Sequence, residues 1–467
     1  MTKKLGFYAL ISLVMGSMIG EGIFSLPQNM ARSASGAGIM LGWAITFTGM
    51  LCLAFVFQML SKYRPKIQTG IQGYAQGLFG NYVGSQAVWG YWLSAMLGNV
   101  SYLLALNAAF AHFDVFAFLT SENGEHMSWY GLAFCSFIMW FFYMLILRGV
   151  QKATLLNTLF TVAKIIPITV FIFVAMYFFS VDTFVFNFSR PELGSLFEQT
   201  KSTMLATVWC FIGIEGATVY ATKAESQKDV GKATVVGFLM TLVLLMLVSM
   251  LPLGSIAQEE IATMATPSMS SIFKYLVGSW GMVFINIAII ISIAGALLAW
   301  ILLATEAPFL AATEALMPKG FTKQNKEGVP VYTLLTVLFI MQIFLVISFF
   351  KDAIYQDAFM LASAMILIPY LLSAIFGVKV ALQENLAGKY KILAFVASIY
   401  GFWLLYAADL KFVLFSTILY AIGLGFYAYS RKTHGKLVFE NKQEKYLAMI
   451  VMLLAVYATY LWFTELA

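Results

Sequence analysis

Long apolar segments recur along the whole chain, and they restrict its fold more than any other feature. A membrane-spanning helix needs about 20 predominantly apolar residues, and such segments lie at approximately 7–32, 38–60, 81–112, 130–147, 154–180, 201–222, 233–256, 276–305, 331–349, 355–378, 391–408, 412–430 and 445–464. Charged residues make up only 11% of the chain, where soluble domains carry about 25%. The sequence therefore predicts an all-α polytopic membrane protein with about 12–13 transmembrane helices. Whether 445–464 spans is left open.

The basic residues indicate how the segments cross the membrane. With the N-terminus in the cytoplasm, the cytoplasmic loops hold about 21 of the 28 Lys and Arg residues, as the positive-inside rule requires. The net charge of +6 is then a topology signal, and no nucleic-acid partner is indicated. Short tails indicate a bacterial protein of the cytoplasmic membrane. The stretch Glu306–Met317 is predicted to form a short amphipathic cytoplasmic helix.

The residues that build metal and catalytic sites are scarce and scattered. Cys52, Cys135 and Cys210 stand alone in apolar segments without metal or redox spacing. The three histidines are scattered, and neither a HExxH pair nor a phosphate-binding GxxxxGK occurs. No metal site, cofactor or catalytic site is therefore predicted. A channel or receptor would need a selectivity loop or a ligand-binding domain, and neither is found.

A helix break is predicted inside the first apolar segment, at Gly16-Ser17-Met18-Ile19-Gly20-Glu21-Gly22-Ile23-Phe24. Each glycine costs a helix about 1 kcal/mol relative to alanine, and Glu21 places a charge near the middle of a span. Broken helix at membrane depth is tolerated only where its freed N–H and C=O groups line a cavity or meet a ligand. We therefore interpret this stretch as a binding site. Close helix packing is an alternative for the glycines, but it does not explain Glu21.

A second break is predicted five segments later, at Trp209-Cys210-Phe211-Ile212-Gly213-Ile214-Glu215-Gly216-Ala217. Matching breaks in the first and sixth spans are typical of an inverted five-plus-five repeat, because an odd number of spans reverses the topology. The predicted units are a first repeat at 1–180, a second repeat at 198–380 and additional C-terminal transmembrane helices at 389–467. N–H groups after Gly22 would face an anion, and carbonyls near Gly213 would face a cation. This arrangement suits a zwitterionic amino acid.

Five motifs, taken in order, carry a family resemblance. They are GSMIGEGIFSLPQNM (16–30), YWLSAMLGNVSY (91–102), WCFIGIEGA (209–217), DVGKATVVGF (229–238) and ALLAWILLATEAPFLAA (296–312). They resemble the basic amino acid/polyamine antiporters of the amino acid-polyamine-organocation (APC) superfamily, and the arginine/ornithine antiporters most closely. The resemblance implies a LeuT-like fold, with two inverted five-helix repeats and unwound first and sixth helices. It also implies sodium-independent exchange of an amino acid for its metabolic product by alternating access.

The resemblance places the substrate at the two helix breaks. Backbone amides of the first break would receive the substrate carboxylate, and carbonyls of the second would receive its α-ammonium. Two tryptophans would close over the substrate from outside, and an asparagine would contact its side chain. In that order, the implied substrate-binding residues are Gly20, Glu21, Gly22 and Ile23; Phe211, Ile212 and Ile214; and Trp209, Trp300 and Asn99. Interfacial belts and helix packing are the ordinary roles of membrane tryptophans and stay open as alternatives.

Three further residues are implied in gating and coupling. Tyr91 resembles a lower gating tyrosine. Glu215 resembles a glutamate of the inner gate, where it is either sensitive to pH or a structural hydrogen-bond acceptor, and we favour a gating role. Lys164 resembles the lysine that takes the place of a sodium ion in sodium-independent relatives, and snorkelling to the interface is the alternative.

Glu21 departs from the family pattern, which has a small residue between the two glycines. Its charge has the same sign as the substrate carboxylate. Glu21 therefore either reaches towards a cationic group of the ligand or is protonated and couples transport to pH. The ionisable groups expected deep in the membrane are Glu21, Glu215 and Lys164, which leaves one unmatched negative charge. Arginine, lysine, ornithine or a decarboxylated amine would neutralise it.

These observations predict a secondary antiporter, not an enzyme, that exchanges a cationic amino acid such as arginine for ornithine, agmatine or a related amine. Proton-coupled symport or uniport without exchange is an alternative. Exchange of histidine for histamine or of lysine for cadaverine is another. The expected partners are the amino acid and amine substrates and the lipid bilayer, with a homodimer left open.

The unmatched charge generates a testable prediction. Replacing Glu21 by Gln should weaken the binding of cationic substrates, because the neutral side chain no longer attracts their positive charge. The measurement is substrate affinity of the purified protein across a range of pH. Unchanged affinity at every pH would remove Glu21 from the ligand site.

Overall fold

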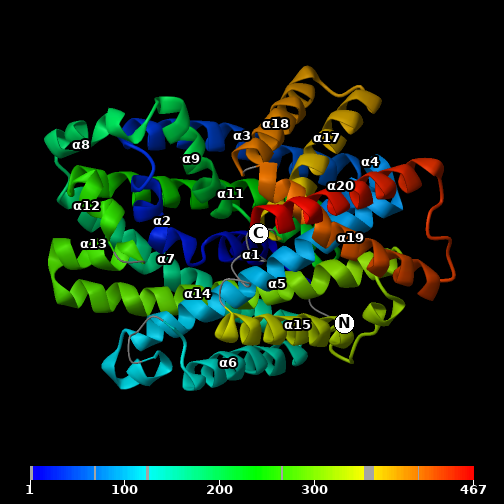
Figure 1. Cartoon of the computed structure of the whole chain (residues 1–467), viewed down its shortest axis with the longest axis horizontal. Coiled ribbons are helices and arrows are strands. Elements are labelled where there is room, and N and C mark those ends of the chain that lie inside the picture. The colour runs from blue at the N-terminus through cyan, green and yellow to red at the C-terminus, as the bar shows by residue number, and fades with distance from the viewer. Residues whose placement is uncertain are drawn as a thin grey trace.

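The computed structural model describes residues 4–67, 70–121, 126–264, 267–351, 362–408 and 410–466, and these residues form the predicted all-α protein (Figure 1). Within these ranges, β-structure is confined to two isolated bridges, Leu5 with Ala224 and Thr120 with Met127. The first ten helices are α1 (Phe7–Met18), α2 (Gly22–Ala31), α3 (Gly36–Tyr63), α4 (Ile71–Phe79), α5 (Asn81–Ala111), α6 (Trp129–Leu147), α7 (Val150–Tyr177), α8 (Val181–Phe188), α9 (Leu196–Trp209) and α10 (Gly216–Val219). The others are α11 (Gln227–Met250), α12 (Gln258–Thr263), α13 (Ser268–Val277), α14 (Ser279–Thr313), α15 (Val331–Phe350), α17 (Leu367–Gln383), α18 (Gly388–Ala407), α19 (Leu410–Thr433) and α20 (Lys442–Leu466).

The helices agree with the apolar segments of the sequence. In the described part of the chain, 11 helices are long and apolar enough to cross a membrane, and α1 with α2, bent by 45° at their junction, makes a twelfth candidate. The predicted segment 201–222 is divided between α9 and α10, with 14 and 4 residues, and neither is long enough to span alone. Residues 355–361 of the tenth predicted segment lie outside the described residues. In α20 the apolar run is long enough to span.

The short helix expected at Glu306–Met317 is a wrong prediction. Helix α14 runs without interruption from Ser279 to Thr313 and includes most of this stretch. Its last turns are buried on more than one face, since Ala307, Leu310 and Ala312 are all buried, so this stretch is not an amphipathic surface helix. Glu306 is buried as well, and its carboxylate is paired with the ammonium of Lys223 at 2.6 Å. The ion pair allows the helix to continue inside the protein.

The two broken helices lie at the centre of the molecule. Helix α1 packs against α7, α10, α11 and α14, and Figure 1 shows it between α11 and α14. The long helices α5 and α14 pack along each other beside it. Apolar residues of α1 such as Leu13 and Val14 belong to the main buried core together with Leu297 of α14. The predicted site is therefore enclosed by other helices.

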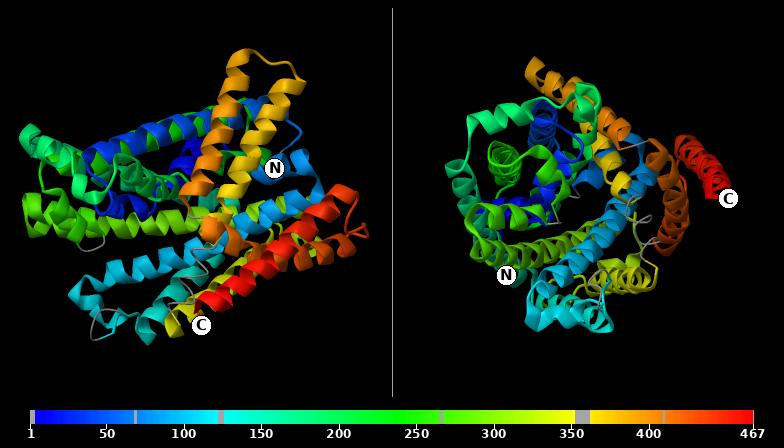
Figure 2. Two further views of the ribbon diagram at one scale, coloured as in Figure 1. Left: turned by 45° about the horizontal axis from the view of Figure 1, so that its top comes forward. Right: turned by 60° about the vertical axis from the view of Figure 1, so that its left-hand side comes forward.

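The C-terminal helices form the edge of the molecule. Helices α17 and α18 pack on each other and stand at a steep angle to most of the other helices (Figure 2, left). Helices α19 and α20 form a second pair, with α20 at the periphery (Figure 2, right). Only 17% of the apolar window of α20 is buried, which leaves most of this helix available to lipid.

A buried carboxylate joins α20 to the start of α5. Gly80, the residue before α5, has no side chain to cap the helix. Glu444 of α20 takes this role, because its Oε1 accepts from the N–H of Asn81 at 2.7 Å and from that of Tyr82 at 3.4 Å. A carboxylate is favoured there by the partial positive charge of a helix N-terminus. The outermost helix therefore helps to position the helix that carries Tyr91 and Asn99.

Loss of this cap should destabilise the protein. We expect Glu444→Ala to lower the free energy of unfolding by about 1–2 kcal/mol, because two N–H groups at the start of α5 lose their acceptor. The measurement is thermal unfolding of the purified protein in detergent. Gln443→Ala is the matched control, since Gln443 is the exposed neighbour. Equal stability of the two variants would show that α5 does not depend on Glu444.

Candidate functional site

The first helix break presents backbone donors at the start of α2. Helix α1 ends at Met18 and α2 begins at Gly22, and the first N–H groups of a helix have no partner within it. The N–H of Gly20 already donates to the Met18 carbonyl at 3.2 Å. In the described structure, the donors left for a ligand are therefore those of Glu21, Gly22 and Ile23.

The carbonyl groups freed at the same break are bound by a lysine. Lys164 of α7 is fully buried, and its ammonium donates to the carbonyl oxygen of Gly16 at 2.9 Å and to that of Ile19. The hydroxyl of Ser292 in α14 lies 3.5 Å from the same Ile19 oxygen. The end of α1 carries partial negative charge. The protein itself thus supplies a cation where α1, α7 and α14 meet.

The second break depends on a glycine in a left-handed conformation. Gly213, between α9 and α10, has φ +112°, which residues with a side chain rarely adopt. A Cβ at this position would lie 2.7 Å from Ser17 Oγ. The Ser17 hydroxyl lies 3.0 Å from the Gly213 carbonyl oxygen, within hydrogen-bond distance, and the carbonyls of Leu13 and Val14 in its own helix are alternative acceptors of its proton. The two breaks therefore touch each other directly.

Buried side chains from four helices close the space on the α10 side of the breaks. Glu215, at the start of α10, accepts a hydrogen bond at Oε2 from the Tyr370 hydroxyl of α17. Trp300 of α14 donates from Nε1 to the Ser17 carbonyl at 2.9 Å. The ring centroids of Trp300 and Tyr91, which lies in α5, are 6.0 Å apart. These contacts leave all four side chains buried.

A cavity of about 690 Å³ opens on the other side of the breaks, between α2, α5, α9 and α17. Among the described residues that line it, Glu21 is the only one with a charged side chain. A void of about 20 Å³ shares part of this wall and reaches Trp300. The cavity wall combines aromatic, small polar and acidic residues, among them Glu21, Gly22, Tyr102, Trp209, Ile212 and Ser363. It is suited to a ligand with both apolar and cationic parts.

The structure brings only some of the predicted substrate-binding residues to this cavity. Glu21, Gly22, Trp209 and Ile212 line the cavity, and Trp300 lines the small void. The predicted residues that line neither space are Gly20, Ile23, Asn99, Phe211 and Ile214.

Asn99 and Phe211 lie in the packed interior. Asn99 is fully buried, and its carboxamide has no hydrogen-bond partner in the described part of the chain. The Phe211 ring packs at 6.1 Å from the Trp43 ring and at 5.1 Å from the Phe238 ring. The role predicted for Phe211 concerns its carbonyl, and Asn99 would reach a ligand only after rearrangement. Both roles stay predictions.

Two tyrosines of the site were not predicted. Tyr102 lines the cavity and the void, and Gly20 lies against its ring. A signal for Tyr102 exists, because Ala95 and Gly98 lie on its face of α5 and leave space beside it. Tyr370 has no local signal, since its contact with Glu215 joins residues 155 positions apart.

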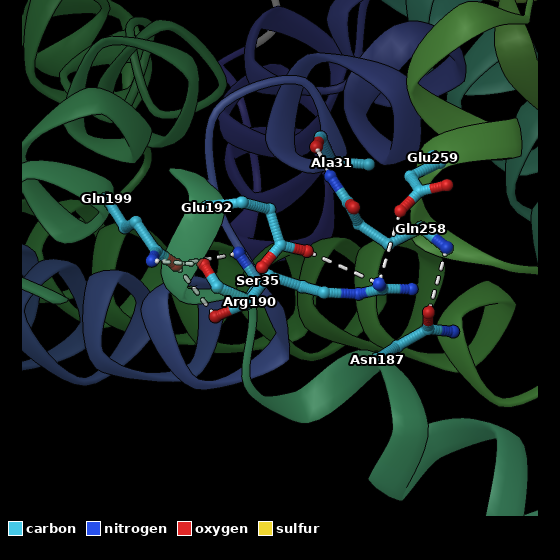
Figure 3. A network of polar contacts seen from close by, with 8 residues as sticks. All are labelled: Ala31, Ser35, Asn187, Arg190, Glu192, Gln199, Gln258 and Glu259. Atoms are coloured by element: carbon cyan, nitrogen blue, oxygen red, sulfur yellow. Dashed lines mark hydrogen bonds and ion pairs between the residues drawn. The ribbon is translucent and has the colours of Figure 1, made fainter. Parts of the chain in front are cut away.

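A polar network holds the far ends of the helices around the cavity (Figure 3). Gln258 of α12 donates from its carboxamide to the carbonyl of Ala31, the last residue of α2, and from its backbone N–H to Asn187 at 2.8 Å. Gln199 of α9 accepts from the Ser35 N–H at 2.9 Å. Helix α2 is thereby tied to α12, and α9 to the start of α3.

An arginine completes this network. The guanidinium of Arg190 lies 3.3 Å from the carboxylate of Glu192 and 3.1 Å from that of Glu259 (Figure 3). Its carbonyl accepts from Gln199 Nε2 at 3.0 Å. Exposed ion pairs contribute little each, so the network positions these helix ends more than it stabilises the fold.

Comparisons with known proteins find relatives along nearly the whole chain. A family model described as amino acid permease matches residues 5–456. The arginine/ornithine antiporter of Pseudomonas aeruginosa is 41% identical over 477 residues, which covers 98% of each chain. The arginine/agmatine antiporter of Chlamydia felis is 36% identical over 478 residues, which covers 99% of this chain and 97% of the relative.

The close approach of Gly20 to Tyr102 allows a steric test. A Cβ at Gly20 would lie 2.5 Å from the Tyr102 hydroxyl oxygen and 2.9 Å from its ring. We expect Gly20→Ala to lower the free energy of unfolding by about 1–3 kcal/mol, the usual cost of overpacking. Gly98→Ala, at a position in the wall of the void where a Cβ meets nothing within 4 Å, is the control. Thermal unfolding measures both, and equal midpoints would contradict the close contact.

Proposed function

This chain belongs to the amino acid permease family, and from that premise we propose that it exchanges a cationic amino acid, arginine first of all, for ornithine, agmatine or a related amine. The family and its antiporter members indicate a transporter rather than an enzyme. The observation that carries the substrate proposal is the cavity in which Glu21 is the only charged residue among the described residues of the lining. An unmatched charge at membrane depth is costly, and either a cationic substrate or a proton that accompanies the substrate neutralises it.

The substrate would bind across the two helix breaks. Its carboxylate would accept from the N–H groups of Gly22 and Ile23, where the start of α2 carries partial positive charge. Its α-ammonium would donate to the carbonyl of Ile212, which lines the cavity, and would reach that of Ile214 only after rearrangement. Its side chain would lie against Trp209, since an indole face binds a cation with about 0.5–2 kcal/mol.

Alternating access follows from the asymmetry of the site. The positive-inside rule puts the N-terminus in the cytoplasm, so α2 and α9 would lie in the outer half and the cavity would open outwards. Glu215, Tyr91 and Trp300 would form the inner gate, supported by the Glu215–Tyr370 and Trp300–Ser17 hydrogen bonds. Opening to the cytoplasm would require these bonds to break.

Lys164 would make transport independent of sodium. Its ammonium donates to the carbonyls of Gly16 and Ile19, and these are ligands of the type that a sodium ion binds. A covalently attached cation at this place leaves no need for a bound one. The hydrogen bonds support this proposal, and transport in the absence of sodium tests it.

The exchange itself gives a direct prediction. We expect proteoliposomes in sodium-free buffer to take up labelled arginine when they are loaded with ornithine or agmatine and to take up little when they are empty. The reason is that the empty carrier would reorient slowly. Loading with lysine, histidine or histamine measures selectivity, and liposomes without protein are the control.

Other outcomes would change the proposal in defined ways. Strong uptake into empty vesicles under a pH gradient would mean proton symport in place of exchange. A requirement for sodium would contradict the role of Lys164. Absence of arginine uptake under every loading would reject arginine as the substrate.

A further inference from the structure

The side chain of Glu21 is the most unusual group in the cavity. It belongs to the residue directly before α2, yet it accepts no capping hydrogen bond from the N–H groups of that helix. Among the described residues, no Lys, Arg or His forms an ion pair with it. The side chain is partly exposed and lines the cavity. It therefore faces whatever ligand the cavity holds.

In the part of the chain that the structure describes, the surrounding helices do not supply a compensating charge. On α5 the nearest titratable group is the Tyr102 hydroxyl, and after α9 it is the Cys210 thiol, which also lines the cavity. The ammonium of Lys164 is bound to the carbonyls of Gly16 and Ile19. The carboxylate of Glu215 is held by Tyr370 on the closed side of the breaks. Among the described residues none balances the charge of Glu21, which leaves a proton or the ligand to do so.

An amino acid and its decarboxylated amine favour opposite charge states of Glu21. The carboxylate of an amino acid, bound at the N–H groups of Gly22 and Ile23, would lie beside an ionised Glu21, and like charges at short range repel in a low-dielectric site. A proton on Glu21 removes the repulsion. A decarboxylated amine has lost this carboxylate, so its ammonium is no longer paired within the molecule and favours an ionised Glu21.

We propose that Glu21 is protonated when the cavity holds a cationic amino acid and ionised when it holds the corresponding decarboxylated diamine. This inference rests on the proposed exchange function and names the amine as one substrate class. The charges balance in both states. Arginine, with a net charge of +1, binds with neutral Glu21, and agmatine, with a charge of +2, binds with Glu21 at −1.

The transport cycle then moves no net charge. Arginine enters together with the proton on Glu21, and both are released inside. Agmatine leaves as a dication with Glu21 ionised, and Glu21 takes up a new proton from the outside after agmatine is released. Two positive charges move in and two move out, so the exchange is electroneutral and imports one proton.

The membrane potential separates this mechanism from simple exchange. We expect arginine/agmatine exchange by the wild-type protein to be insensitive to potential. In Glu21→Gln no proton is carried, so each turnover moves one positive charge outwards, and an interior-positive potential should favour arginine uptake. The equilibrium arginine/agmatine ratio across the membrane should then shift about fiftyfold per 100 mV. Potentials are set with potassium and valinomycin.

The dependence of affinity on pH is a second readout. In the wild type, agmatine affinity should rise and arginine affinity fall as pH increases through the titration of Glu21. In Glu21→Gln both should be flat, with agmatine bound about tenfold more weakly at high pH, as for one lost charge-assisted hydrogen bond. The weaker binding of cationic substrates that we expect for Glu21→Gln therefore affects mainly the amine.

Two further variants serve as controls. Glu21→Asp keeps a titratable carboxylate and should keep electroneutral exchange. Glu260→Gln removes a carboxylate on the exposed surface of α12 and should behave as wild type.

The outcomes separate this inference from the proposed function. Wild-type arginine/agmatine exchange that responds to potential would overturn the inference and leave the antiporter standing, whether or not Glu21→Gln folds. Exchange of arginine with ornithine but not with agmatine would likewise overturn the inference and leave the antiporter standing. Absence of arginine exchange with any internal substrate would reject the proposed function and this inference together.

Discussion

The structure depends on one constraint, which is that backbone groups freed by a helix break inside a membrane need partners. The carbonyls at the end of α1 are bound by the ammonium of Lys164. The Gly213 carbonyl at the other break accepts from the Gly216 N–H at 2.8 Å and lies 3.0 Å from the Ser17 hydroxyl. Lys164 and Ser17 belong to α7 and α1, so each break is contacted by a helix distant in sequence. The first amides of α2 have no partner in the described structure, and a ligand is proposed to bind them.

The same constraint connects the two sides of the site. Because Ser17 contacts Gly213 directly, and Trp300 donates to the Ser17 carbonyl, a movement of α1 must disturb α10 and α14. The cavity lies on one side of these contacts, and the buried Glu215–Tyr370 hydrogen bond lies on the other. An asymmetric site of this kind has one open and one closed side, which is the arrangement that alternating access requires.

Elements far from the cavity determine how its helices are held. Gln258 and Gln199 hold the outer ends of α2 and α9 (Figure 3), and Glu444 holds the start of α5. None of these three residues belongs to a motif that points to a ligand. They are polar groups that satisfy helix ends, and in doing so they set the distances between the half-helices.

The sequence by itself determined the all-α membrane fold, the spans and the positions of both helix breaks, because apolar length and glycine content are local properties. It also pointed to Glu21 and Lys164, since a charge in an apolar segment is visible without a structure. Tertiary structure decided which of these groups meet. Tyr102 and Tyr370 join the site through contacts between distant segments, Asn99 is turned into the core, and α14 continues past Glu306 because Lys223 neutralises its charge. Such pairings depend on helix packing, which no local pattern records.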